Sequence, residues 1–144
     1  MKSQTRLGLR ALVIVIASLG WVPATPANEP AAKVPSALVW NHDGSLLVSL
    51  RDAKELVTID PKSWSVKATA SLPFRPSALL SLPEARAVLV GGMEGELLRI
   101  DRKGTRTLRE LQGRGPLRMV AIDSGRVALA SPWSRSVEVV DAEN

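Results

Sequence analysis

The feature that most constrains the fold of this chain is a repeat of about 40 residues. The segment PSALV at 35–39 returns as PSALL at 76–80 and, more loosely, as PLRMV at 116–120. A second marker, an aliphatic residue followed by aspartate, keeps the same spacing and occurs at Ile59-Asp60, Ile100-Asp101 and Val140-Asp141. Phased markers of this kind indicate an array of equivalent structural units.

Each repeat contains short apolar or alternating stretches separated by turn signals, a pattern typical of antiparallel strands. In the first repeat the turns are marked by Asp43-Gly44, where glycine accepts a positive φ, and by Asp60-Pro61, where proline fixes φ. Outside the N-terminal segment no window has the apolar spacing of a helix, which disfavours helical repeats. The expected strands are residues 36–40, 45–50, 55–59, 64–71, 77–82, 87–91, 96–100, 105–111, 117–122, 126–130 and 136–140.

The pattern predicts an all-β fold: a partial β-propeller of four-stranded antiparallel blades, preceded by a signal-peptide helix. The expected blades are residues 35–75, 76–115 and 116–144, and the third lacks its fourth strand. Each blade of a propeller buries its faces only against its neighbours, so a partial ring leaves two apolar faces exposed. Three explanations stay open: a truncated reading frame, self-association that closes a ring, and docking on another propeller or domain or persistence as an open stack.

Residues 1–27 are predicted to be a cleaved signal peptide. Basic residues precede an apolar run at 11–22 that is too short to span a bilayer comfortably, and Ala24 and Ala27 suit a signal peptidase. The alternatives are a short membrane anchor and a buried helix. Cleavage leaves an irregular leader at 28–34 and no stable membrane span. We therefore expect export through a Sec-type signal and a periplasmic or extracellular location.

Removal of this segment also changes the charge of the chain. The full sequence has a formal net charge of +5, but three of its 19 basic residues and none of its 14 acidic residues precede residue 28. No basic run with interleaved aromatic residues remains, so a nucleic-acid partner is not expected. The sequence contains no cysteine, which excludes disulfides, thiolate zinc sites and iron–sulfur clusters within this chain.

The repeat unit resembles the YVTN-type β-propeller repeat of exported bacterial and archaeal proteins. The unit opens with Pro-Ser and Asp-Gly, and continues through a strand ending in Ile-Asp to a strand rich in lysine, valine and alanine. The matching stretches are residues 35–44, 46–49, 56–60 and 66–70. Tyrosine is absent, and so is the Tyr-Val-Thr-Asn string that gives the family its name.

The resemblance constrains the function only broadly, because such propellers serve as surface proteins, binding scaffolds and parts of redox enzymes. We expect an exported binding or scaffold module, a fragment of a longer protein, with a protein partner or self-association through its exposed blade faces. The alternative is the N-terminal propeller part of a redox enzyme: a cytochrome c or haem peroxidase fusion, or a propeller-type dehydrogenase or lactonase. A third class is a structural envelope protein with many such repeats.

No residue of this chain is predicted to be catalytic, to bind a cofactor or to hold a metal. His42 is the only histidine and is expected to be an exposed turn residue, without the companions that a triad or a metal site needs. Asp60, Asp101 and Asp141 recur at one repeat position and are expected to cap turns. The glycine-rich segment 91–95 lacks the lysine of a phosphate loop and is expected to be a hairpin turn.

Strand alternation predicts one candidate binding surface. If consecutive strands alternate in direction, the links between blades and the turns between second and third strands emerge at the same face. These loops carry Asp52, Met93 and Glu94 together with the candidate residues for a ligand or partner face, which are Arg51, Arg75, Arg114, Trp133 and Arg135. The arginines suit an anionic ligand or an acidic partner, and the alternative is ordinary solvated loop charge. Trp40 and Trp64 are expected to pack between blades.

Overall fold

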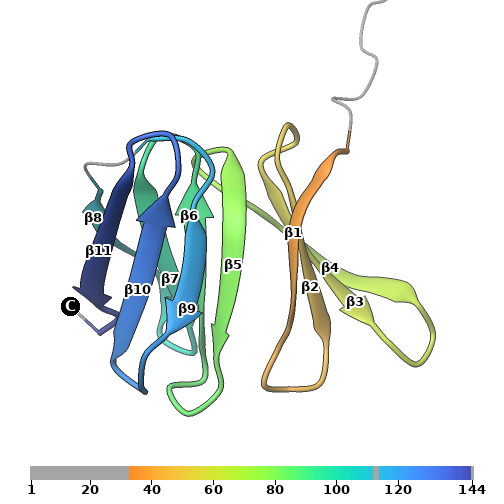
Figure 1. Ribbon diagram of the computed structural model, residues 1–144. Helices are drawn as coiled ribbons and strands as arrows, with labels where there is room; N and C mark the ends of the chain where they lie inside the picture. Colours follow the sequence, from red (N-terminus) through yellow and green to blue (C-terminus); the bar gives the residue numbers. More distant parts are fainter. Residues whose placement is uncertain (1–32, 112–113, 144) are drawn as a thin grey trace, which may run out of the picture.

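The structure, a computed structural model, describes residues 33–111 and 114–143. These residues form three antiparallel sheets of consecutive strands, and they contain no helix (Figure 1). The predicted signal peptide at 1–27 lies outside the described residues, as do residues 28–32 of the expected leader.

The first sheet consists of β1 (Pro35–Trp40), β2 (Leu46–Leu50), β3 (Glu55–Asp60) and β4 (Ser65–Ser71). The second consists of β5 (Pro76–Leu82), β6 (Ala87–Gly92), β7 (Glu96–Asp101) and β8 (Gly104–Glu110). The third consists of β9 (Arg118–Ala121), β10 (Arg126–Ser131) and β11 (Ser136–Asp141). Each strand begins and ends within a residue of its expected position, so the predicted all-β plan is confirmed.

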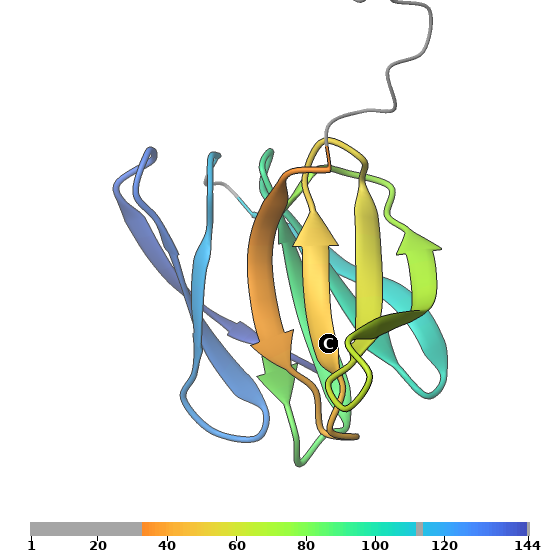
Figure 2. The same ribbon diagram turned by 90° about the vertical axis from the view of Figure 1, so that its right-hand side faces the viewer.

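The three sheets stack through their first strands. β1 lies beside β5, and β5 lies beside β9, while β4 and β8 form the far edges of the first and second sheets (Figures 1 and 2). Each sheet therefore turns its broad faces toward its neighbours in the stack. This is the arrangement of successive propeller blades.

Two apolar cores fill the spaces between the sheets. The core between the first and second sheets includes Leu47, Leu56, Phe74, Val88, Val90 and Leu98. The core between the second and third sheets includes Leu89, Leu97, Leu117, Val127, Leu129 and Val140. Because successive residues of a strand point to opposite faces, β6 contributes alternate side chains to both cores and is buried along its whole length.

The Pro-Ser marker of the repeat has a structural role. The Ser77 hydroxyl donates a hydrogen bond to the carbonyl oxygen of Gly91 (3.2 Å) and accepts the backbone N–H of Leu117 (3.2 Å). A single hydroxyl thus joins two strands of the second sheet to the start of the third sheet. In the first sheet the hydroxyls of Ser36 and Ser49 lie 2.9 Å apart. The repeated serine therefore supports the scaffold.

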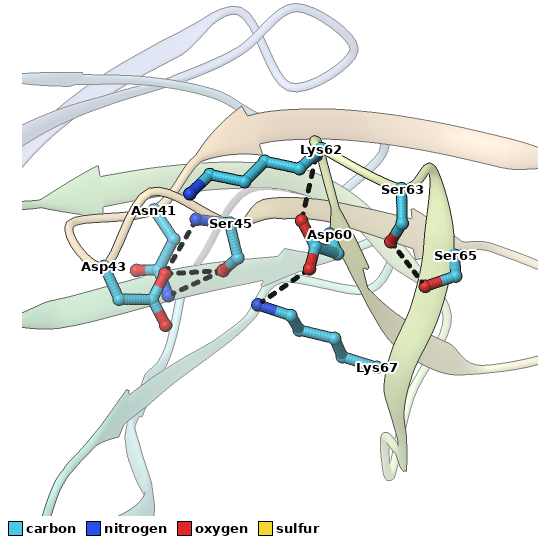
Figure 3. A network of polar contacts seen from close by, with 8 residues as sticks. All are labelled: Asn41, Asp43, Ser45, Asp60, Lys62, Ser63, Ser65 and Lys67. Carbon is cyan, nitrogen blue, oxygen red and sulfur yellow. Dashed lines mark hydrogen bonds and ion pairs between the residues drawn. The ribbon is translucent and has the colours of Figure 1, made fainter.

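The recurring aspartates cap turns, as the sequence predicts. A side-chain oxygen of each accepts the backbone N–H two residues later, at 2.9 Å for Asp60, 2.8 Å for Asp101 and 2.7 Å for Asp141. Asp43 and Asp123 make the same bond in the turns between the first two strands of their sheets, at 2.9 and 3.1 Å. Figure 3 shows the polar contacts in the turns of Asp43 and Asp60.

These caps predict that the protein loses stability in acid. Hydrogen bonds from Ser45 lower the pKa of Asp43, and bonds from Arg126 and Gly125 lower the pKa of Asp123. A folded-state pKa below the unfolded value of about 3.9 means that the stabilisation is complete above that pH and is lost as the pH falls through the folded pKa. We expect the urea midpoint to stay constant from about pH 7 to 5 and to fall below about pH 4.

The Asp123→Asn variant should show a shallower loss of the urea midpoint below about pH 4 than the unmodified protein, because one of the depressed carboxyls is gone. The control is Glu84→Gln, which removes an exposed carboxylate that forms no hydrogen bond among the described residues. An identical acid profile for Asp123→Asn and the unmodified protein would contradict the role of this cap.

The prediction that Trp40 and Trp64 pack between blades is wrong within the described residues. Trp40 is 57% exposed and Trp64 is 72% exposed. Trp40 lies on the face of the first sheet that turns away from the second sheet, so no described sheet covers it. Trp64 lies in the turn before β4 with a φ of 53°, beyond the end of the paired strands.

Candidate functional site

The candidate site lies at the end of the molecule where the sheets are joined. The β2–β3, β6–β7 and β10–β11 turns lie at the same end as the links that lead into β5 and β9, the upper end in Figures 1 and 2. This follows from the topology, because four antiparallel strands return the chain to the end at which it entered the sheet. The loops that carry the five predicted residues therefore share one end of the molecule.

Backbone hydrogen bonds join three of these loops into a rim, namely the links that lead into β5 and β9 and the β6–β7 turn. The Met93 N–H donates to the Arg75 carbonyl oxygen (3.0 Å), and the Gly115 N–H donates to the Met93 carbonyl oxygen (2.7 Å). The β6–β7 turn is thus held between the two links that flank it. A rim whose backbone is fixed in advance loses less conformational entropy when it binds a ligand.

Arg114 is held to the third sheet by two serine hydroxyls that the sequence analysis did not single out. Its N–H donates to Ser134 Oγ (2.8 Å), and its carbonyl oxygen accepts a hydrogen bond from Ser131 Oγ (2.7 Å). The link into the third sheet and the β10–β11 turn are thereby fixed to each other. The sequence signal is only a Ser-Pro-Trp-Ser turn at 131–134, which does not say which backbone groups meet there.

The indole of Trp133 lies against the backbone of Gly115. A methyl group placed on Gly115 would be 2.5 Å from Cδ2 of the indole, which is closer than real side chains approach. Gly115 also has a φ of 93°, a left-handed conformation that favours glycine. The Trp133 side chain nevertheless remains 71% exposed. The result is an aromatic surface with a fixed backing, of the kind on which a ligand can stack.

Two exposed arginines are sequence neighbours of the residues in this contact. Arg114 directly precedes Gly115, and Arg135 lies in the same turn as Trp133, where its N–H donates to the Pro132 carbonyl oxygen (3.4 Å). Among the described residues neither guanidinium forms an ion pair. Positive charge on the same loops as an accessible aromatic ring favours a planar anionic group such as a carboxylate.

The other two predicted arginines differ in their surroundings. Arg75 is exposed and belongs to the rim through its bond with Met93. Arg51 has its Nε 3.3 Å from Asp52 Oδ1, and its N–H donates to the Val34 carbonyl oxygen (2.9 Å). A neighbouring carboxylate therefore offsets the charge of Arg51, which is the weakest member of the predicted set. The binding role of the whole set stays a prediction.

The part of the chain that the structure describes offers few other groups for catalysis or metal binding. His42 lies in an exposed turn with its Nδ1 2.9 Å from Asn41 Oδ1. The described residues contain no group of three or more His, Cys, Asp or Glu side chains that could hold a metal ion. Within those same residues, no helix has the length and apolar character needed to cross a membrane.

Comparison with solved structures shows which known proteins share this arrangement of sheets. No protein-family model and no curated protein sequence matches the chain. Hydrazine synthase from Kuenenia stuttgartiensis matches with a TM-score of 0.63 at 16% identity, over 86% of this chain and 37% of that one. The dihydro-heme d1 dehydrogenase NirN matches with a TM-score of 0.59 at 20% identity, over 74% of this chain and 25% of that one. Streptogramin B lyase matches with a TM-score of 0.55 at 13% identity, over 81% of this chain and 43% of that one.

These similar structures are propeller-like proteins, and the similarity identifies the fold of this chain. The chain is a β-propeller segment. At these sequence identities the similarity shows the fold alone. The segment spans less than half the length of each of the three proteins.

Proposed function

We propose that this segment is an exported, YVTN-type propeller module that binds an acidic segment of a protein partner at the loop end of its sheets. The observation that carries the proposal is Trp133, which is exposed and backed by Gly115, with exposed Arg114 and Arg135 on the same two loops. The repeat pattern supports the YVTN type. The basic and apolar character of residues 1–27 supports export through a Sec-type signal to the periplasm or the cell exterior.

Physical chemistry favours this kind of ligand. Arginine forms short, charge-assisted hydrogen bonds with carboxylates and can hold both oxygens of the group at once. Tryptophan and arginine are also the side chains that most often carry the binding energy of protein interfaces. A rigid sheet scaffold that presents such residues on its loops is a common design for recognition.

We expect the double variant Arg114→Gln, Arg135→Gln to bind poly-L-glutamate roughly tenfold more weakly, because two exposed charge pairs contribute about 0.5–1 kcal/mol each. Tryptophan fluorescence during titration of the exported protein measures the dissociation constant. Trp133→Ala should lower both the affinity and the fluorescence change. Affinity should also fall as the ionic strength rises.

The matched control removes the same amount of charge from the opposite end. Lys62 and Arg102 lie in exposed turns there, and the variant Lys62→Gln, Arg102→Gln should change the affinity less than about twofold. Equal losses in the two double variants would mean that the protein attracts polyanions only through its net charge. Inorganic phosphate that binds as tightly as the polypeptide would identify a small-anion site instead.

The alternative function is the N-terminal propeller part of a redox enzyme, and the similarity to hydrazine synthase and NirN supports it. The described residues do not fit a haem site, because the single histidine, His42, lies in an exposed turn beside Asn41. The ligands of any haem would therefore have to come from residues outside those described. A Cys-x-x-Cys-His motif in the reading frame beyond codon 144 would support this alternative over a binding module.

A further inference from the structure

Each end of the stack presents an apolar sheet face that the described residues leave largely uncovered. We call the side of a sheet that turns toward the preceding sheet its leading face, and the other side its trailing face. The leading face of the first sheet includes Leu38, Trp40, Leu46, Val48, Ile59 and Val66. The trailing face of the third sheet includes Val120, Ala128, Ala130, Val137 and Val139. Large exposed apolar patches mark interaction sites, and Leu38 is 69% and Val137 75% exposed.

The leading face of the first sheet repeats the pattern of the leading faces that are buried inside the stack. One cross-strand pair occupies the same place in all three sheets, as Leu38–Val48, Leu79–Val90 and Met119–Leu129. Val90 and Leu129 are buried in the two cores, against the preceding sheet. The exposed first-sheet pair is therefore of the type that a preceding sheet covers elsewhere in this molecule.

The trailing face of the third sheet likewise repeats the pattern of the trailing faces that are buried inside the stack. The corresponding cross-strand pairs are Val39–Leu47, Leu80–Leu89 and Val120–Ala128. Leu47 and Leu89 are buried under the following sheet, whereas Val120 is 60% exposed. Inside the stack, each leading face packs on a trailing face. The two end faces are thus equivalent to surfaces that pack on each other within the molecule.

The two end faces are also complementary in size. Trp40 occupies the place that Ser81 and Ala121 hold in the other sheets, because each is paired with the corresponding residue of the second strand. Beside Ala121 a cavity of about 310 Å³ opens against the turn of the preceding sheet that begins at Leu82. The bulk of a tryptophan at this place suits such a cavity. In the third sheet the turn equivalent to that of Leu82 begins at Ile122, which is half exposed.

We propose that a second copy of this chain covers these faces, with the leading face of each copy on the trailing face of the other. The two faces lie at opposite ends of one stack, so they do not meet within a copy. Two copies related by a twofold axis satisfy both faces at once and close the assembly. The three sheets of each copy then form a ring of six, within the four to eight blades that propellers typically have.

Three charged residues occupy trailing-face positions, Arg118, Arg126 and Asp141, and they lie at the ends of their strands, where they do not oppose this docking. Arg126 and Asp141 are partners across β10 and β11, and Arg126 also forms an ion pair with Asp123 (2.6 Å). Arg118 is the first residue of β9 and is paired with Ala130, so it lies at the edge of the face. An arginine can bury its stem while its guanidinium reaches the rim. Arg99 occupies the trailing face of the second sheet, is only 7% exposed, and donates a hydrogen bond to the Ala142 carbonyl oxygen of the third sheet (2.6 Å). The stack therefore already accommodates one arginine at such an interface.

Light scattering of the purified exported protein is expected to give twice the mass of one processed chain. Two variants test the interface, Leu38→Lys on the leading face and Val137→Lys on the trailing face. Each should raise the dimer dissociation constant at least roughly a hundredfold, because the new lysine would place an unpaired charge in the buried interface. Trp64→Lys, at a residue that is equally exposed but lies in a turn, should leave the mass unchanged. Circular dichroism checks that every variant retains its sheet content.

Single cysteines test the direction of docking, since the natural chain contains none. A mixture of Trp40→Cys and Ile122→Cys chains should give a covalent dimer with a short bismaleimide, and neither variant alone should do so. Efficient cross-linking within one variant would show that like faces meet, and would overturn the head-to-tail arrangement. A monomer at all concentrations, or a native protein in which further sheets of one longer polypeptide cover these faces, would overturn the second copy as the occupant.

Discussion

Replacement of Leu97 by alanine is expected to lower the free energy of unfolding by about 2–5 kcal/mol. Leu97 is fully buried in β7, in the core between the second and third sheets. The loss combines the transfer free energy of the removed carbons with the cavity that they leave. A domain of ordinary stability has about 5–15 kcal/mol in total, so the effect is a large share of it.

Urea denaturation measures this change, and the midpoint should fall with little change in slope. The Val34→Ala variant is the control, because Val34 precedes β1 and is partly exposed, and its backbone carbonyl oxygen keeps the bond from Arg51. We expect the control to stay within about 0.5 kcal/mol of the unmodified protein. Equal midpoints for Leu97→Ala and the control would mean that the second and third sheets do not pack as described.

Substitution of Arg99 by methionine is expected to cost about 3 kcal/mol of stability. Its guanidinium is buried between the second and third sheets, with Nε 2.9 Å from Asp101 Oδ2 and Nη1 donating to the Ala142 carbonyl oxygen. Methionine fills much of the volume but leaves both oxygens without this donor. The cost arises because an unsatisfied buried polar group loses its water without a replacement partner.

The Arg99→Met variant should also respond differently to acid. The hydrogen bond from Arg99 is the largest cause of the lowered pKa of Asp101, so this pKa should rise toward its ordinary value in the variant. The part of the acid-dependent stability that comes from Asp101 should then shrink below about pH 4. Arg102→Met removes an exposed arginine from the adjacent turn and should change neither the urea midpoint nor the acid profile appreciably. A stable Arg99→Met variant with an unchanged acid profile would contradict the buried pair.

The candidate site was only partly predictable from the sequence. Strand alternation was enough to place Arg75, Arg114 and Trp133 at one end of the molecule, because direction reverses with each antiparallel strand. The backing of the indole by Gly115 and the bonds from Ser131 and Ser134 were not predictable. These contacts join segments about 20 residues apart whose meeting depends on how two sheets pack.

The sequence by itself determined the local structure of this protein. Period-2 alternation and turn residues such as Asp60 and Asp123 act through near neighbours, so they set strand limits and caps without reference to the rest of the chain. Only the tertiary structure decided which apolar or charged side chains are buried. Trp40 is exposed and Arg99 is buried because burial depends on whether another sheet covers that face, and the partner that Arg99 holds lies 43 residues away.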